Sequence, residues 1–297
     1  ASAHGKIIRD KIHDEVVLPA GPFRGAPSLF VKPAGKRGIF DRMGWQEIRL
    51  ETDCREAATL WEDPLEQRCV AAIIPCYNVA ETCGTIVRAA TAFAGQVIAV
   101  NDGSTDGTKE VLDAVAREYP GRVHVLGWSS NQGKGAALIE AFRYVAEMMP
   151  SPIVVTLDGD GQHQPRDIAR LAQTLAAEEC ELVIGERLAR EKMPLRSRVG
   201  NMATAGLIQW VYPAAPEDTQ SGFRAFAPDF VREIVKVVPA GRYETELRIL
   251  LLALRQRRRI GSVTIPTLYI DDNRLSHFRP LVDSWRIYRT LFACWLL

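Results

Sequence analysis

The chain has 297 residues, enough for one large domain or two small ones, and its 47% hydrophobic and 25% charged residues are typical of a globular protein. These values exclude a disordered chain and a small disulfide-stabilised fold. The 37 Lys and Arg residues nearly balance 36 Asp and Glu residues, so the chain lacks the basic excess that holds nucleic acid non-specifically. We therefore expect no nucleic-acid partner and only local anion sites.

The six cysteines form no Cys-x-x-Cys pair, so we expect reduced thiols rather than a zinc site or a redox motif. The sequence has neither a charged-then-apolar leader nor a run of about 18 apolar residues that could cross a bilayer. We accordingly expect a cytoplasmic protein.

The chain changes character near residue 70. Residues 1–69 contain recurrent Gly and Pro without sustained periodicity, and we interpret them as an N-terminal extension of unknown role. From Val70, short β-branched runs alternate with helix-period stretches, which is typical of an α/β domain with a mainly parallel sheet and helices on both faces. We expect this domain to span 70–278 and an amphipathic helical tail to span 279–297.

Within this domain the hydrophobic pattern predicts individual elements. The predicted strands are Val70–Ile74, Gln96–Val100, Val123–Leu126, Ile153–Leu157 and Leu182–Gly185, with a strand pair near Val263–Ile270. The predicted helices are Glu81–Phe93, Thr108–Tyr119, Lys134–Met148, Val199–Val211 and Thr245–Arg255.

Four predicted loops carry more polar and glycine residues than a structural turn needs. They are Pro75–Asn78, Asn101–Gly107, Asn131–Gly135 and Asp158–His163. Because parallel sheets bind ligands at the carboxyl ends of their strands, we expect all four loops to converge on one edge.

Asp158 and Asp160 stand two residues apart after an apolar strand, so both carboxylates can face one cleft and bind a hard divalent cation, Mg²⁺ or Mn²⁺. Gly159 between them leaves room for a diphosphate. The alternative is a surface turn in which Asp satisfies backbone amides. The Asn101–Gly107 segment has a similar alternative, with Asp106 as an ordinary helix N-cap.

Lys134 lies between two glycines at a predicted helix start, where free amides and an ammonium group suit a phosphate. The segment is not a P-loop, because Trp128 stands where Gly is required and Gly135 replaces Ser or Thr. Nor do Gly159 and Gly161 begin a dinucleotide-binding fingerprint, since Gln164 follows them.

Together with three later segments, these loops resemble the family 2 glycosyltransferases of the GT-A fold, and more narrowly the polyprenyl-phosphate group that includes dolichol-phosphate mannose synthase. The resemblance covers about residues 70–289. The segments that carry it are Ile74–Asn78 with Glu81, Asn101–Thr108, Asn131–Gly135, Asp158–His163, Gly185–Arg187, Asp218–Arg224 and Tyr243–Glu246.

The resemblance implies an inverting enzyme that uses a nucleoside-diphosphate sugar. It places the nucleotide against Pro75, Tyr77, Asn78, Glu81, Asp102 and Lys134, and Mg²⁺ or Mn²⁺ against Asp158, Asp160 and Gln162. Asn101 departs from the Asp that is commoner at its position in the family, so the resemblance does not indicate which nucleotide base the donor carries.

Whether the reaction needs a general base depends on the chemistry of the acceptor. A phosphate monoester, with a second pKa of about 6, is already anionic at neutral pH and needs cations instead. The arginines that could supply them are Arg187, Arg196, Arg198 and Arg224. They favour a polyprenyl phosphate acceptor, with Arg187 and Asp160 as catalytic residues. For a hydroxyl acceptor Asp218 is the candidate base, although it could equally cap a turn.

Two segments suggest peripheral contact with the inner face of the membrane. Arg255 and Arg257–Arg259 follow an apolar helix, although they could also be a solvated helix end. The tail interleaves Trp285, Tyr288 and Trp295 with arginines, which suits a headgroup interface or a partner helix. A catalytically silent nucleotide-sugar binding module remains an alternative function.

Overall fold

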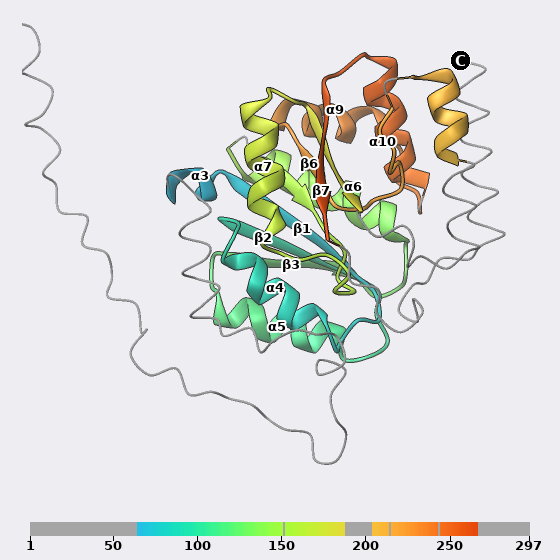
Figure 1. Cartoon of the computed structure of the whole chain (residues 1–297). Helices are drawn as coiled ribbons and strands as arrows, with labels where there is room; N and C mark the ends of the chain where they lie inside the picture. The colour runs from blue at the N-terminus through green and yellow to red at the C-terminus, as the bar shows by residue number, and fades with distance from the viewer. Residues whose placement is uncertain (1–63, 151, 188–203, 214, 243, 267–297) are drawn as a thin grey trace, which may run out of the picture. The chain divides into compact units, whose positions relative to one another are not determined.

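The computed structural model describes residues 64–150, 152–187, 204–213, 215–242 and 244–266 (Figure 1). Its strands are β1 Val70–Cys76, β2 Gln96–Asp102, β3 Val123–Trp128, β4 Ile153–Thr156, β5 Leu182–Arg187, β6 Arg224–Phe226 and β7 Ile260–Ile265. Its helices are α3 Pro64–Arg68, α4 Cys83–Thr91, α5 Thr108–Glu118, α6 Lys134–Met148, α7 Asp167–Ala177, α9 Pro228–Val237 and α10 Glu244–Arg255, and residues 204–211 are also helical.

The seven strands form one sheet in the order β3-β2-β1-β4-β6-β5-β7. All neighbouring pairs are parallel except those that involve β6, which runs antiparallel to β4 and β5. This confirms the predicted mainly parallel sheet. The strand order reverses at β1, because β2 and β3 extend the sheet on one side and β4 begins the other. A crevice between the carboxyl ends of β1 and β4 is therefore the expected ligand site.

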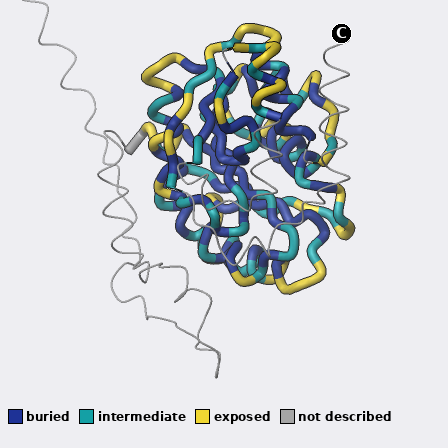
Figure 2. The backbone as a smooth tube through the Cα atoms, turned by 45° about the vertical axis from the view of Figure 1, so that its right-hand side comes forward, coloured by how far each residue is buried: buried dark blue, intermediate teal, exposed yellow. Residues whose placement is uncertain are grey.

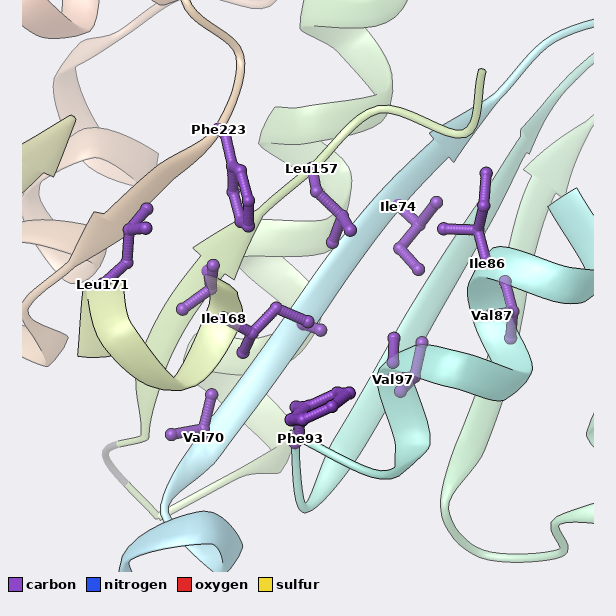
Figure 3. Close-up of a cluster of buried hydrophobic side chains, with 14 of the residues drawn as sticks. Val70, Ile74, Ile86, Val87, Phe93, Val97, Leu157, Ile168, Leu171 and Phe223 are labelled. Atoms are coloured by element: carbon purple, nitrogen blue, oxygen red, sulfur yellow. The ribbon is translucent and has the colours of Figure 1, made fainter. Parts of the chain in front are cut away.

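Helices cover both faces of the sheet because its central strands are buried on both sides. Every residue of β1 except Pro75 is at most 1% exposed. On one face, α4 and α7 pack on Ile74, Val97 and Leu157 (Figure 3). On the other face, α6, α9 and α10 bury a second cluster. In this cluster the rings of Phe142 and Phe226 pack edge to face, with their centroids 5.2 Å apart. Figure 2 shows buried segments in the interior of the described domain and exposed segments at its rim.

The five strands predicted from Val70 to Gly185 are confirmed, with carboxyl ends that differ by one or two residues. The four helices predicted to begin at Glu81, Thr108, Lys134 and Thr245 are also confirmed to within two residues. The helix predicted over 199–211 is seen over 204–211; its first residues lie outside the described part of the chain.

The sequence interpretation missed α3, α7, α9 and β6. The strand β6 has three residues and begins with a charged Arg224, so it lacks the apolar run by which the longer strands were recognised. Of the strand pair predicted near Val263–Ile270, the structure shows one strand, β7, which begins earlier than predicted, at Ile260, and pairs with β5. The part of the predicted pair beyond residue 266 lies outside the described residues and stays a prediction.

Strand β1 begins at Val70, where we predicted the domain to start, and the short helix α3 precedes it. The limits of the domain, of the N-terminal extension and of the tail all stay predictions, since residues 1–63 and 267–297 lie outside the described ranges. Within those ranges no helix combines the length and the apolar character needed to cross a membrane.

The cysteines that the structure describes are all free thiols, as expected. These are Cys69, Cys76, Cys83 and Cys180, of which Cys69 alone is exposed. Burial raises the pKa of Cys83 to about 11, so this thiol stays protonated at neutral pH. Burial also raises the pKa values of Cys76 and Cys180, so the three buried thiols are packing residues that stay protonated.

A close approach of α6 to α10 requires glycine at position 135. A Cβ placed on Gly135 would lie 2.0 Å from Thr245 Oγ1 and 2.4 Å from the Arg242 carbonyl oxygen. Ala136 donates its backbone N–H to the Gly241 carbonyl at 2.9 Å, which fixes this separation. The start of α6, and with it Lys134, is thereby held against α10.

We expect Gly135→Ala to lower the free energy of unfolding by at least about 1–3 kcal/mol, because the methyl group overpacks a contact with backbone. Urea denaturation measures this loss. The matched control is Gly206→Ala, since Gly206 is helical and a Cβ there meets nothing within 4 Å. This control should be neutral or stabilising by up to about 1 kcal/mol. Equal stability of the two variants would contradict the close contact.

Candidate active site

The four polar loops meet at the carboxyl edge of the sheet. The loop after β1 contacts the loop after β4, where Thr82 Oγ1 donates to the Gly159 carbonyl at 2.7 Å. It also contacts the loop after β2, where the Asn78 backbone N–H donates to Ser104 Oγ at 3.0 Å. The convergence predicted from the sequence is confirmed by these bonds between segments far apart in the chain.

Asp102 joins the loop after β2 to the start of α6. Its carboxylate accepts the backbone N–H groups of Gln132 (2.6 Å) and Gly133 (2.9 Å) and the side-chain amide of Asn131 (3.0 Å). Burial raises the pKa of Asp102 despite these donors, and the residue is 2% exposed. In this geometry the carboxylate holds the loop that precedes Lys134, in addition to any contact with a nucleotide.

Lys134 lies between two carboxylates from different elements. Its Nζ is 2.7 Å from Asp158 Oδ1, after β4, and 3.1 Å from Glu246 Oε1, in α10. Burial opposes the ionisation of Asp158, but the charge of Lys134 outweighs it and holds the pKa of this carboxyl below its ordinary value. Asp158 is therefore anionic at neutral pH.

Asp160 behaves differently, although it is only two residues away. Burial and the negative charge of Asp158 raise the pKa of Asp160 to about 6, and its Oδ1 accepts the Gln162 backbone N–H at 3.0 Å. The two carboxylates thus repel each other, and a divalent cation between them would relieve that repulsion.

His163 closes the side of this pair. Its ring packs against Phe223, with ring centroids 5.1 Å apart, and its Nε2 is 3.9 Å from Asp158 Oδ2. Burial lowers the pKa of His163 to about 4, so the ring is neutral at pH 7. Its buried Nδ1 finds no hydrogen-bond partner among the described residues.

These residues fit a divalent cation that shares its coordination with a ligand. Carboxylate oxygens from Asp158 and Asp160 are the hard donors that Mg²⁺ and Mn²⁺ prefer. At Asp160, burial and repulsion by Asp158 outweigh the hydrogen bond from Gln162 and the charge of Lys134. The described part of the chain offers no cluster of three or more His, Cys, Asp or Glu residues suited to a metal. A cation here would therefore need other oxygens, such as those of a diphosphate.

Arg187 and Asp218 form a second, separate ion pair at the end of β5. Arg187 Nε and Nη2 donate to the two Asp218 oxygens at 2.6 and 2.8 Å. Burial works against the ionisation of Asp218, but the hydrogen bond and charge of Arg187 lower its pKa. A carboxylate held in this way is a weak proton acceptor. The other predicted acceptor arginines, Arg196 and Arg198, lie outside the described residues.

Arg224 is 1% exposed, and its side chain forms hydrogen bonds inside the domain. Its guanidinium donates to the carbonyls of Ser221 (2.8 Å), Glu246 (2.7 Å) and Thr219 (2.9 Å). The side chain thus ties the segment 219–221 to α10 and has no open face for a phosphate in this structure. We therefore leave Arg224 out of the acceptor site proposed below.

The residues predicted to meet the nucleotide lie where β1 ends. Pro75, Tyr77 and Asn78 are partly exposed, and Glu81 is exposed beside them. The Asn78 side-chain oxygen accepts the Thr105 backbone N–H at 2.8 Å, so this segment is fixed to the next loop. The structure brings these residues to the same edge as the carboxylate pair.

Sequence reasoning gave no role to Glu246, His163 or Gly222. All three lie in segments that carry the family resemblance, but only the fold shows what they contact. A Cβ on Gly222 would be 2.7 Å from Lys134 Nζ and 2.9 Å from Asp158 Oδ2. Nothing in the local sequence of Gly222 or Glu246 indicates a contact with a helix start more than 80 residues away.

Comparison with known proteins identifies the family. Residues 71–230 match the profile of "Glycosyl transferase family 2". The chain belongs to glycosyl transferase family 2. As a member of this family it is a nucleotide-sugar-dependent glycosyltransferase, which replaces the alternative of a silent binding module.

Two relatives of this family 2 enzyme have named activities. A UDP-N-acetylglucosamine–dolichyl-phosphate N-acetylglucosaminyltransferase of Methanococcus voltae is 29% identical over 235 residues, which cover 74% of this chain and 93% of the relative. An undecaprenyl-phosphate mannosyltransferase of Micrococcus luteus is 30% identical over 213 residues, which cover 68% and 84%.

Solved structures show that this glycosyltransferase has the GT-A fold. Mannosyl-3-phosphoglycerate synthase from Rubrobacter xylanophilus superposes with a TM-score of 0.59 at 19% identity, covering 82% of this chain and 81% of that one. Glucosyl-3-phosphoglycerate synthase from Mycobacterium tuberculosis gives 0.57 at 19% identity, covering 81% and 84%. At this identity the likeness concerns the fold.

The raised pKa of Asp160 makes a prediction about stability without metal. The folded protein binds the Asp160 proton more tightly than the unfolded chain does, so the bound proton stabilises the folded state. This stabilisation is complete below pH 4 and is lost as the pH rises through about 6. We expect Asp160→Asn, which cannot ionise, to be more stable than the wild type at pH 8 by about 1–2 kcal/mol.

Urea denaturation in EDTA at pH 4.5 and pH 8 measures this difference for both proteins. The advantage of Asp160→Asn should shrink at pH 4.5. An equal difference at the two pH values would show that Asp160 ionises with an ordinary pKa and that the two carboxylates do not repel each other.

Proposed function

We propose that this glycosyltransferase transfers a sugar, with inversion, from a nucleoside-diphosphate sugar to a polyprenyl phosphate at the membrane surface. The observation that carries the donor half is the pair of interacting carboxylates, Asp158 and Asp160, at the point where the strand order reverses. The acceptor half is supported by the named activities of the two relatives, which act on dolichyl and undecaprenyl phosphates.

The donor chemistry depends on charge. When the bond between the sugar and the diphosphate breaks, negative charge develops on the departing phosphates, and a bound Mg²⁺ or Mn²⁺ would stabilise it. Asp158 and Asp160, with Gln162 beside them, would hold that cation. A Mycobacterium tuberculosis relative in fold was crystallised with Mn²⁺ and UDP, which supports the same cation here.

The nucleotide would lie along the end of β1. Pro75, Tyr77, Asn78 and Glu81 are accessible there, and Asp102 anchors the loop on the other side. Gly159 packs against this strand end, since a Cβ at position 159 would be 3.0 Å from Cys76 Sγ. Gly159, between the two carboxylates, thus lies close to the end of β1, where we propose that the nucleotide binds.

A phosphate acceptor needs positive charge and no base. The Arg187 side chain is 14% exposed and Asp218 fixes its orientation, so its positive charge is aligned before an acceptor binds. A hydroxyl acceptor would need Asp218 as base, and the lowered pKa of Asp218 disfavours that role. We propose Arg187, with Arg196 and Arg198, as the acceptor phosphate site.

The test of this function uses the wild-type chain, Mn²⁺ and a panel of nucleotide sugars. Thermal shifts with and without Mn²⁺ identify the donor, because a ligand that binds the folded state stabilises it by mass action. Release of nucleoside diphosphate is then measured with a polyprenyl phosphate and with free sugars. Faster release with free sugars would contradict the proposed acceptor.

Arg187→Ala separates donor from acceptor in the same assay. We expect it to raise the acceptor KM at least about tenfold and to leave donor binding within about twofold, since a charged hydrogen bond contributes about 1.5–3 kcal/mol. Asp218→Asn is the companion variant, which keeps Arg187 but weakens its alignment, and it should have a smaller effect. Equal loss of donor and acceptor binding would move Arg187 to the donor side.

Apolar side chains on the described surface support contact with a membrane. In the helical segment 204–211, Trp210 is 75% exposed and Leu207 is 42% exposed. Arg258, by contrast, is paired with Glu181 and Glu233 and lies over Phe230, which favours a structural role for this arginine. We propose that segment 204–211 and the amphipathic tail 279–297 contact the lipid surface.

We expect Trp210→Ser, and removal of residues 281–297, each to lower the fraction of protein that floats with anionic liposomes, because each removes apolar area from the interface. The matched control is Val237→Ser, since Val237 is 55% exposed in the separate helix α9. It should bind liposomes as the wild type does. An unchanged bound fraction in both altered proteins would contradict membrane contact.

A further inference from the structure

Three charged side chains from three elements meet beside the proposed cation site. Lys134 comes from the start of α6, Asp158 from the end of β4 and Glu246 from the first turn of α10. Their side chains are 18%, 27% and 12% exposed, so the ion pairs are largely shielded from water. The Lys134 ammonium is therefore shared between a carboxylate proposed to hold the cation and one outside the proposed site.

The backbone around this cluster fixes its geometry. A Cβ on Gly222 would lie within 3.1 Å of the charged atoms of all three residues, so the Gly222 backbone closes one side of the cluster. Arg224 donates to the Glu246 carbonyl at 2.7 Å and anchors the start of α10. Neither Lys134 nor Glu246 can move far without displacing the segment 219–222.

The charges in the cluster act on a cation in opposite directions. Lys134 occupies Asp158 Oδ1 at 2.7 Å, so it competes with a cation for that carboxylate and repels it. Glu246, 3.1 Å from the same ammonium, neutralises Lys134 and draws it away from Asp158. The Lys134–Glu246 pair adds no net charge, yet each member changes the field at Asp158.

We propose that Lys134 and Glu246 are positioning residues that set how tightly Asp158 and Asp160 hold a divalent cation, with Lys134 weakening the binding and Glu246 strengthening it. This inference rests on the proposed function, because it requires a cation at Asp158 and Asp160. It assigns Lys134 a role at the carboxylates, which are the groups it contacts, and gives Glu246 a role at the site.

The test measures Mn²⁺ binding to the full chain by the electron paramagnetic resonance signal of free Mn²⁺, alone and with UDP or GDP. We expect Lys134→Met to tighten binding about tenfold and Glu246→Gln to weaken it about tenfold. The double variant restores the net charge and should bind within about threefold of the wild type. Lys134→Gln, which keeps a polar end group, should also tighten binding.

Matched controls carry the same chemical changes at exposed ion pairs elsewhere. Lys109→Met alters the Lys109–Asp113 pair of α5, and Glu140→Gln alters the Glu140–Arg143 pair of α6. Neither should change Mn²⁺ affinity. Urea midpoints of all variants show whether each is folded at the temperature of the binding measurement.

A purely structural role for the cluster would give a different pattern, in which both single variants weaken Mn²⁺ binding and the double variant weakens it further. That pattern, or unchanged affinity in the single variants, would overturn the inference and leave the proposed function intact. Wild-type protein that binds no Mn²⁺ in any of the three conditions would overturn the cation site and the inference together.

Discussion

Repulsion between two carboxylates at the end of one buried strand is the interaction on which the site depends. Asp158 and Asp160 are too close to ionise independently, and burial strengthens the effect. The Lys134 ammonium compensates the charge of Asp158, whereas the pKa of Asp160 is raised to about 6. The folded chain thus maintains a local deficit of positive charge, which a divalent cation is suited to fill.

The rest of the structure keeps these charges in place. Asp102 accepts three donors from the loop before α6 and thereby positions the start of the helix that carries Lys134. Gly135 lets that helix approach α10, which brings Glu246 to the ammonium. Buried Arg224 joins α10 to the segment that contains Gly222. Each of these contacts links segments that are distant in the sequence.

The proposed donor and acceptor sites use different pairs of charged side chains. The two carboxylates proposed for the donor site lie after β4, near the centre of the sheet, whereas Arg187 and Asp218 form an ion pair at the end of β5. In the second pair, Arg187 lowers the pKa of Asp218, so this carboxylate stays anionic. Two hydrogen bonds between the side chains keep the pair aligned. In the proposed function, this aligned cation would meet a ligand that is already charged, which is the property of a phosphate acceptor.

The sequence by itself determined the alternation of strands and helices, the edge where the loops meet and the position of Asp158 and Asp160 at that edge, because hydrophobic periodicity and short local motifs encode these features. It missed α3, α7, α9 and β6. The contact of Glu246 with Lys134, the pairing of Asp218 with Arg187 and the burial of Arg224 were decided only by the tertiary structure. Such contacts join residues tens to more than a hundred positions apart, so no local pattern encodes them. The pKa values of Asp218 and Arg224 shift only because folding buries these groups beside their partners.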